Sequence, residues 1–131
     1  MTQSLNLNNT QLLSNDFELD LSYLKKFSCN DPVFEKDILL SSLEETDEKM
    51  QMIHFSIVNN KLSQIKPLAH SLRSLMNIIG AATLCQYFYQ IEHYNETNDF
   101  EKEVINKFEI IKEKWQYAKL KLGVAIYEYP I

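Results

Sequence analysis

The chain has 131 residues, of which 45% are apolar, and this is the size and composition of one domain with one hydrophobic core. Two glycines and three prolines leave almost no material for the many tight turns of an all-β sandwich or barrel, so we predict a mainly helical protein. The net charge of −5 argues against nucleic acid or an anionic membrane as a partner bound through bulk charge.

The N-terminal region divides into a tail and a short helix. Residues 1–15 are polar and rich in asparagine, and we expect a flexible tail there, followed by a single domain over residues 16–131. Residues 16–29 have apolar side chains at helical spacing, which predicts a short amphipathic helix carrying Phe17, Leu21, Leu24 and Phe27.

A long helix is predicted next, over residues 33–58. Asp31 is a suitable N-cap and Pro32 suits the first helical position. Steps of four and three residues then mark one buried stripe: Leu39, Leu43, Thr46, Met50, Ile53 and Ile57. The polar run at residues 59–61 ends the pattern.

The second half of the chain shows three further apolar stripes. The first runs from Ile65 to Ile79, with Pro67 in its first turn. Gly80 follows, and we predict a tight turn there rather than a bend in one helix, because glycine is favoured just beyond a helix C-terminus. The next stripe is Ala81, Leu84, Phe88 and Ile91. After a loop at residues 95–99, the last is Val104, Phe108, Ile111, Trp115, Ala118, Leu122 and Ala125, ending near residues 123–127.

Four long amphipathic helices joined by short loops can bury their stripes together as an antiparallel bundle. We therefore predict an all-α fold, an up-down-up-down antiparallel four-helix bundle with a short additional N-terminal helix. Acidic residues crowd the second helix and lysines crowd the last, and we interpret both groups as solvated faces.

Two cysteines far apart in sequence, Cys29 and Cys85, fit reduced thiols that pack as small core hydrophobes. No window approaches the roughly 18 apolar residues of a membrane span, and the N-terminus lacks the pattern of a secretory signal. We therefore expect a cytoplasmic protein with no membrane partner.

One histidine has a suggestive helical environment. At 100° per residue, His70 points away from the Ile65 to Ile79 stripe and toward solvent. Lys66, Arg73, Ser74 and Asn77 share this polar face, four before and three, four and seven residues after the histidine. An exposed, neutral imidazole keeps one nitrogen lone pair with which it can attack phosphorus.

The segment from Ala69 to Ala81 resembles the signature of histidine-containing phosphotransfer (HPt) domains, A-H-x-L-K-G followed by five residues and G-A. The matching positions are Ala69, His70, Leu72, Gly80 and Ala81. Arg73 replaces the usual lysine, and Ser74 replaces the usual glycine. Further along, Leu84 and Ile91-Glu92 resemble the family's continuation, and the looser resemblance extends over residues 17–122.

This resemblance implies a phosphocarrier rather than an enzyme. His70 would accept a phosphoryl group from the aspartate of a receiver domain and pass it to another receiver, in a two-component phosphorelay. The partners would be receiver domains of response regulators or of a hybrid sensor histidine kinase, and the receiver would supply Mg²⁺ and the catalytic groups. We expect no intrinsic cofactor or metal, and we expect the protein to be a monomer.

The other candidate residues of the site have supporting roles. Arg73 would hold the phosphoryl group through bidentate hydrogen bonds and Lys66 through a longer-range field, while Ser74 and Asn77 would lie in the docking surface. Gly80 has a structural role, and Glu92 is a candidate for orienting the ring, with Gln90 and Tyr94 beside it.

Three other classes of protein can be compared with this hypothesis. No Glu-x-x-His sequence exists, which makes a di-iron bundle improbable, and we interpret His54 and His93 as surface or boundary residues. Cys85 has no cation near it in sequence to activate its thiol as a nucleophile. The serious alternative is a non-phosphorylated, HPt-like helical adaptor that binds a signalling partner.

Overall fold

The computed structural model describes residues 19–94 and 99–129, and the elements found there are helical, which confirms the all-α prediction. They are α2 (Ser22–Phe27), α3 (Pro32–Val58), the 3-10 turn η2 (Leu62–Gln64), α4 (Ile65–Ile78), α5 (Ala82–Glu92) and α6 (Phe100–Tyr127). The predicted tail, Phe17 and most of the loop at residues 95–99 lie outside the described residues. None of the helices in the described ranges is both long and apolar enough to cross a membrane.

The start and end of α3 follow from its flanking residues. The Asp31 carboxylate accepts a hydrogen bond from the backbone N–H of Val33 at 3.0 Å, and Pro32 occupies the first turn, as predicted. At the other end Asn60 takes a positive φ of 55°, and the N–H of Lys61 bonds back to the carbonyl of Ser56 at 2.7 Å. This left-handed C-terminal turn satisfies carbonyls that the helix leaves open.

A tight turn at Gly80 separates α4 from α5, as predicted. Gly80 has φ 71°, and its carbonyl accepts a hydrogen bond from the N–H of Asp20 at 3.1 Å. A Cβ at this position would collide with the backbone of Asp20. Glycine is therefore required twice, for its conformation and for the close approach of the chain that leads into α2.

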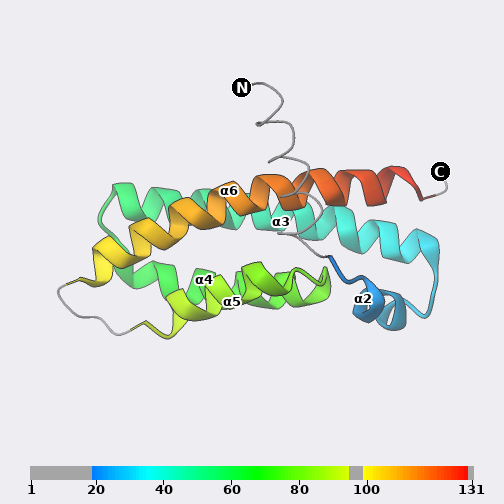
Figure 1. Ribbon diagram of the computed structural model, residues 1–131, viewed down its shortest axis with the longest axis horizontal. Helices are drawn as coiled ribbons and strands as arrows, with labels where there is room; N and C mark the ends of the chain where they lie inside the picture. The colour runs from blue at the N-terminus through cyan, green and yellow to red at the C-terminus, as the bar shows by residue number, and fades with distance from the viewer. Residues whose placement is uncertain (1–18, 95–98, 130–131) are drawn as a thin grey trace, which may run out of the picture.

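Figure 1 shows α3 and α6 side by side above the α4–α5 hairpin, with α2 near the turn between α4 and α5. Contacts join α3 to α4, α4 to α5, α5 to α6 and α6 to α3, so each long helix packs against two others. The predicted stripes meet in the middle, where the largest fully buried side chains include Trp115, Phe88, Phe108, Leu39, Ile53, Leu72 and Leu84.

Several predictions about individual side chains are wrong. Phe27, expected to face inward, is 58% exposed and stacks on the exposed ring of Phe34 with centroids 6.2 Å apart. Cys29 is exposed rather than a core residue, because it takes a positive φ of 55° in the turn after α2. Ile57 packs against the core, as predicted, but it is only partly buried, and its neighbour Ser56 is the more buried residue.

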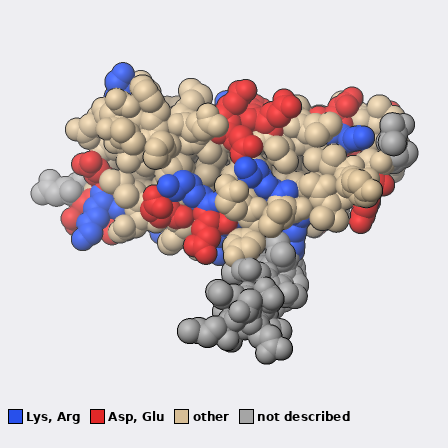
Figure 2. Space-filling view, turned by 90° about the horizontal axis from the view of Figure 1, so that it is seen from above, with Lys and Arg blue, Asp and Glu red and all other residues tan. Residues whose placement is uncertain are grey.

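The acidic face of α3 is also less solvated than predicted. Glu35 is buried and contacts Tyr129. The pKa of the Tyr129 phenol is raised, first by burial and then by the charge and hydrogen bond of Glu35. Asp47 forms an ion pair with Lys119 of α6 at 3.3 Å. In Figure 2 acidic and basic side chains lie close to one another on the face seen from above. The acidic residues of α3 and the lysines of α6 thus partly neutralise each other.

Candidate functional site

His70 lies on the outer side of α4, with its side chain 60% exposed, as the helical pattern predicted. The same helix buries Ile65, Ala69, Leu72 and Met76 on its inner side. The amphipathic pattern that holds α4 against the bundle is therefore what directs the imidazole outward.

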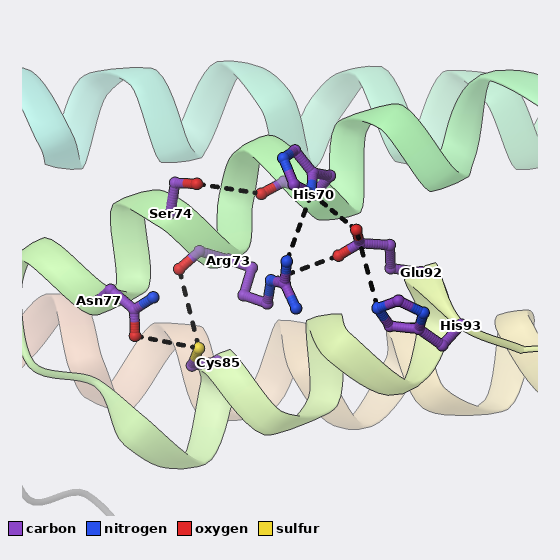
Figure 3. Close-up of polar contacts among 7 residues, drawn as sticks. All are labelled: His70, Arg73, Ser74, Asn77, Cys85, Glu92 and His93. Atoms are coloured by element: carbon purple, nitrogen blue, oxygen red, sulfur yellow. Dashed lines mark hydrogen bonds and ion pairs between the residues drawn. The ribbon is translucent and has the colours of Figure 1, made fainter.

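Glu92, near the C-terminus of α5, reaches back to His70. The distance between His70 Nδ1 and Glu92 Oε1 is 2.6 Å, and the Glu92 side chain is only 15% exposed (Figure 3). The contact joins residues 22 apart in sequence, and the turn at Gly80 makes it possible by folding α5 back along α4. The structure thus brings together the acceptor candidate and the predicted ring-orienting residue.

This contact favours one tautomer of the His70 ring. An ionised carboxylate only accepts hydrogen bonds, so its approach to Nδ1 favours the tautomer that carries the proton there. In the neutral imidazole the lone pair then lies on Nε2, the nitrogen that does not face Glu92. The arrangement provides an exposed ring with one oriented nucleophilic nitrogen.

Arg73 supports the carboxylate rather than standing free. Its Nε lies 3.3 Å from Glu92 Oε2 in an ion pair that lacks hydrogen-bond alignment, and a terminal nitrogen lies 3.4 Å from His70 Nδ1. Arg73 is thus beside the nitrogen that donates to Glu92, not beside Nε2. Its predicted bidentate contact with a phosphoryl group stays a prediction, and the contact observed is with Glu92.

Lys66, the other predicted cation, is turned to the opposite end of the site. Its amine donates a hydrogen bond to the carbonyl of Tyr94 at 2.7 Å and lies 5.3 Å from the centre of the Phe100 ring. Tyr94 is half-buried, and burial followed by the charges of Glu103 and Asp99 raises the pKa of its phenol. Lys66 and Tyr94 therefore connect the ends of α4 and α5 to the start of α6.

The remaining predicted surface residues continue along α4. Ser74 is exposed, and its hydroxyl donates to the His70 carbonyl at 3.4 Å. Asn77 is exposed, and its side-chain oxygen accepts from the Cys85 thiol at 3.3 Å. Cys85 is half-buried, and burial raises the pKa of its thiol while the nearby charge of Arg73 partly offsets that rise. The expectation that Cys85 has no cation nearby is thus wrong, because the fold brings Arg73 close.

Tyr89 and His93 also contact the site, although neither was predicted there from the sequence. The Tyr89 ring, 47% exposed, lies under the Arg73 guanidinium at 5.2 Å and packs on the His93 imidazole with centroids 4.2 Å apart. His93 is on the surface, as predicted, but its Nε2 is 3.9 Å from Glu92 Oε1. The i, i+4 spacing of Tyr89 and His93 could have indicated that their rings are in contact, although not that Tyr89 meets Arg73.

Comparison of the chain with models of protein families, with curated proteins and with solved structures finds no match. In residues 19–94 and 99–129, no group of three or more His, Cys, Asp or Glu side chains is arranged to hold a metal ion.

Proposed function

We propose that this protein is a cytoplasmic histidine phosphotransfer protein, whose four long helices form an up-down-up-down antiparallel bundle with a short N-terminal helix. His70 accepts a phosphoryl group from a receiver-domain aspartate and passes it to another receiver. The observation that carries the proposal is the 2.6 Å contact of His70 Nδ1 with Glu92 on an imidazole that is 60% exposed. The resemblance of residues 69–81 to HPt domains supports it independently.

The transfer uses the lone pair of His70 Nε2. This pair attacks the phosphorus of the receiver's aspartyl phosphate, the N–P bond forms, and the P–O bond breaks with its electrons leaving on the aspartate carboxylate. Because Nδ1 keeps its proton, the ring becomes positively charged as the N–P bond forms. Glu92 is placed to stabilise that charge through the hydrogen bond that it already accepts.

The other catalytic groups come from the partner. A loose phosphoryl transition state requires a metal ion and positive charge around the equatorial oxygens. The receiver supplies Mg²⁺ together with its own catalytic residues, and this chain supplies an accessible and oriented nucleophile. Ser74 and Asn77, both exposed on α4, belong to the surface on which the receiver docks.

Phosphoryl transfer from a phosphorylated receiver tests the proposal directly. The wild-type protein is expected to acquire an acid-labile, base-stable phosphate in the presence of Mg²⁺, and His70→Gln is expected to acquire none. His54→Gln and His93→Gln are matched controls, since both histidines are exposed, and both variants should be labelled. Label on His70→Gln would contradict the assignment of the site. Unlabelled wild type across the receivers of the source organism would favour an HPt-like adaptor instead.

A further inference from the structure

Arg73 has two competing acceptors, and the choice between them decides which nitrogen of His70 is nucleophilic. Its Nε is 3.3 Å from Glu92 Oε2, and a terminal nitrogen is 3.4 Å from His70 Nδ1. A guanidinium only donates hydrogen bonds, so it cannot bond to an Nδ1 that carries a proton. If Arg73 donates to Nδ1, the ring proton must move to Nε2 and the outward lone pair is lost.

Tyr89 lies where it can bias that choice. The Arg73 guanidinium sits over the Tyr89 ring at 5.2 Å, and Tyr89 is on α5, the helix that also carries Glu92. A cation over the face of an aromatic ring is attracted by the electron-rich surface of the ring. The ring therefore provides a platform that holds the guanidinium on the α5 side, where its Nε pairs with Glu92 Oε2 at 3.3 Å while a terminal nitrogen stays 3.4 Å from His70 Nδ1.

The same ring also packs against a second imidazole that approaches Glu92. The His93 ring is tilted against Tyr89 with centroids 4.2 Å apart, and its Nε2 is 3.9 Å from Glu92 Oε1, the oxygen that His70 uses at 2.6 Å. That separation is too long for a hydrogen bond. The contact with Tyr89 thus accompanies a geometry in which His93 stays beside the carboxylate oxygen without bonding to it.

We propose that Tyr89 is a positioning residue: its ring holds the Arg73 guanidinium beside Glu92, so that Glu92 keeps the proton of His70 on Nδ1. The chemical importance of this tautomer rests on the proposed phosphotransfer, whereas the tautomer itself can be measured without any partner. The Tyr89 hydroxyl plays no part, because every contact described involves the ring face.

Two substitutions at Tyr89 separate the ring from the hydroxyl. Tyr89→Phe keeps the platform, and Tyr89→Leu removes it while leaving an apolar side chain at an exposed position where little stability is at stake. Long-range ¹H–¹⁵N NMR spectra of the histidine rings report which nitrogen of His70 carries the proton. In Tyr89→Leu the population with the proton on Nε2 is expected to rise about twofold to fivefold relative to the other tautomer, the effect of one exposed cation–π contact.

The kinetic readout is the transfer rate at saturating receiver together with the receiver dissociation constant. Tyr89→Leu should lower the rate by the same fraction by which it lowers the Nδ1-protonated population of His70, and it should change the dissociation constant by less than twofold. Tyr89→Phe should match the wild type in both.

The outcomes distinguish this inference from the proposed function. An unchanged His70 tautomer in Tyr89→Leu, or a Tyr89→Phe variant as altered as Tyr89→Leu, would overturn the role of the Tyr89 ring. A shifted tautomer in a protein that no phosphorylated receiver labels would support the positioning role while contradicting phosphotransfer.

Discussion

Two regions of the molecule use the same pair of groups, a nitrogen heterocycle and a carboxylate, for different ends. On the α4–α5 face, His70 Nδ1 lies 2.6 Å from Glu92 Oε1. Between α6 and α3, Trp115 Nε1 donates to Asp47 Oδ1 at 2.7 Å. In both regions the ring comes from one helix and the carboxylate from another, so each contact joins two helices.

The balance of charge is also similar in the two regions. Arg73 lies 3.3 Å from Glu92, and Lys119 lies 3.3 Å from Asp47. Each carboxylate therefore has a cation as well as a ring N–H, which offsets the cost of holding a charge away from water.

The difference lies in burial and in the second nitrogen. Trp115 is 2% exposed, and its indole has one nitrogen, already used as a donor, so this contact can only stabilise the fold. The His70 side chain is 60% exposed, and its second nitrogen keeps a lone pair. The same kind of hydrogen bond that anchors an indole thus orients an imidazole for chemistry. Substitution should therefore lower stability in the buried region and phosphoryl transfer in the exposed region.

Removing the buried ring should have the larger effect on stability. Trp115→Ala is expected to lower the free energy of unfolding by about 3–5 kcal/mol, because it leaves a cavity in the core. Trp115→Phe should cost less, since most of the ring volume remains while Asp47 loses its indole donor. Urea unfolding followed by circular dichroism measures both variants. The exposed counterpart, His70→Gln, should change the same free energy by no more than about 0.5 kcal/mol. Equal losses for Trp115→Ala and His70→Gln would remove the distinction between the two regions.

The turn at Gly80 offers a way to disturb the hairpin that carries His70 and Glu92. Gly80→Ala should destabilise the protein by at least about 1–2 kcal/mol, because alanine is strained at positive φ and its Cβ would meet the backbone of Asp20. Gly123→Ala is the matched control, since Gly123 lies within α6 with open space around it. That change should stabilise the protein by roughly 0.5–1 kcal/mol. Thermal unfolding checks both signs, and a neutral Gly80→Ala would show that the turn tolerates a side chain.

The charge of Glu92 can be removed with little change of shape. Glu92→Gln should slow phosphoryl transfer about tenfold, because a neutral amide stabilises the positive phosphorylated ring less than a carboxylate does. The same change at the exposed Glu113 of α6 is the control and should leave the rate unaltered. Rapid-quench measurement of the transfer rate decides, and a Glu92→Gln variant as fast as wild type would leave the carboxylate without a role in the reaction.

The limits of α3, the Gly80 turn and the outward direction of His70 were predictable from the sequence because they depend on local signals, whereas α2 covers only Ser22–Phe27 of the helix predicted over residues 16–29. The Asp31-Pro32 start of α3, the Gly80 turn and the buried stripes all follow from capping, conformational and periodic preferences of residues close together in the chain. The exposure of Cys29 was not predictable in this way, since it depends on a left-handed turn that has no glycine.

The partners of the charged side chains could not be read from spacing along one helix. Lys66 and Arg73 were expected to face an incoming phosphoryl group, yet each contacts a group on or just after α5, the Tyr94 carbonyl and Glu92 respectively. Such contacts depend on the register of the α4–α5 hairpin, which the turn and the packing of both helices set together. Tyr89 was missed for the same reason, because its ring acts on Arg73 across the two helices.

The position of the phosphate on the His70 ring tests the central claim most directly. After incubation with a phosphorylated receiver and Mg²⁺, long-range ¹H–¹⁵N NMR spectra should show phosphorus attached to Nε2 of His70, with the proton still on Nδ1. Phosphorus on Nδ1, or a His70 ring that stays unmodified while the protein is labelled elsewhere, would contradict it.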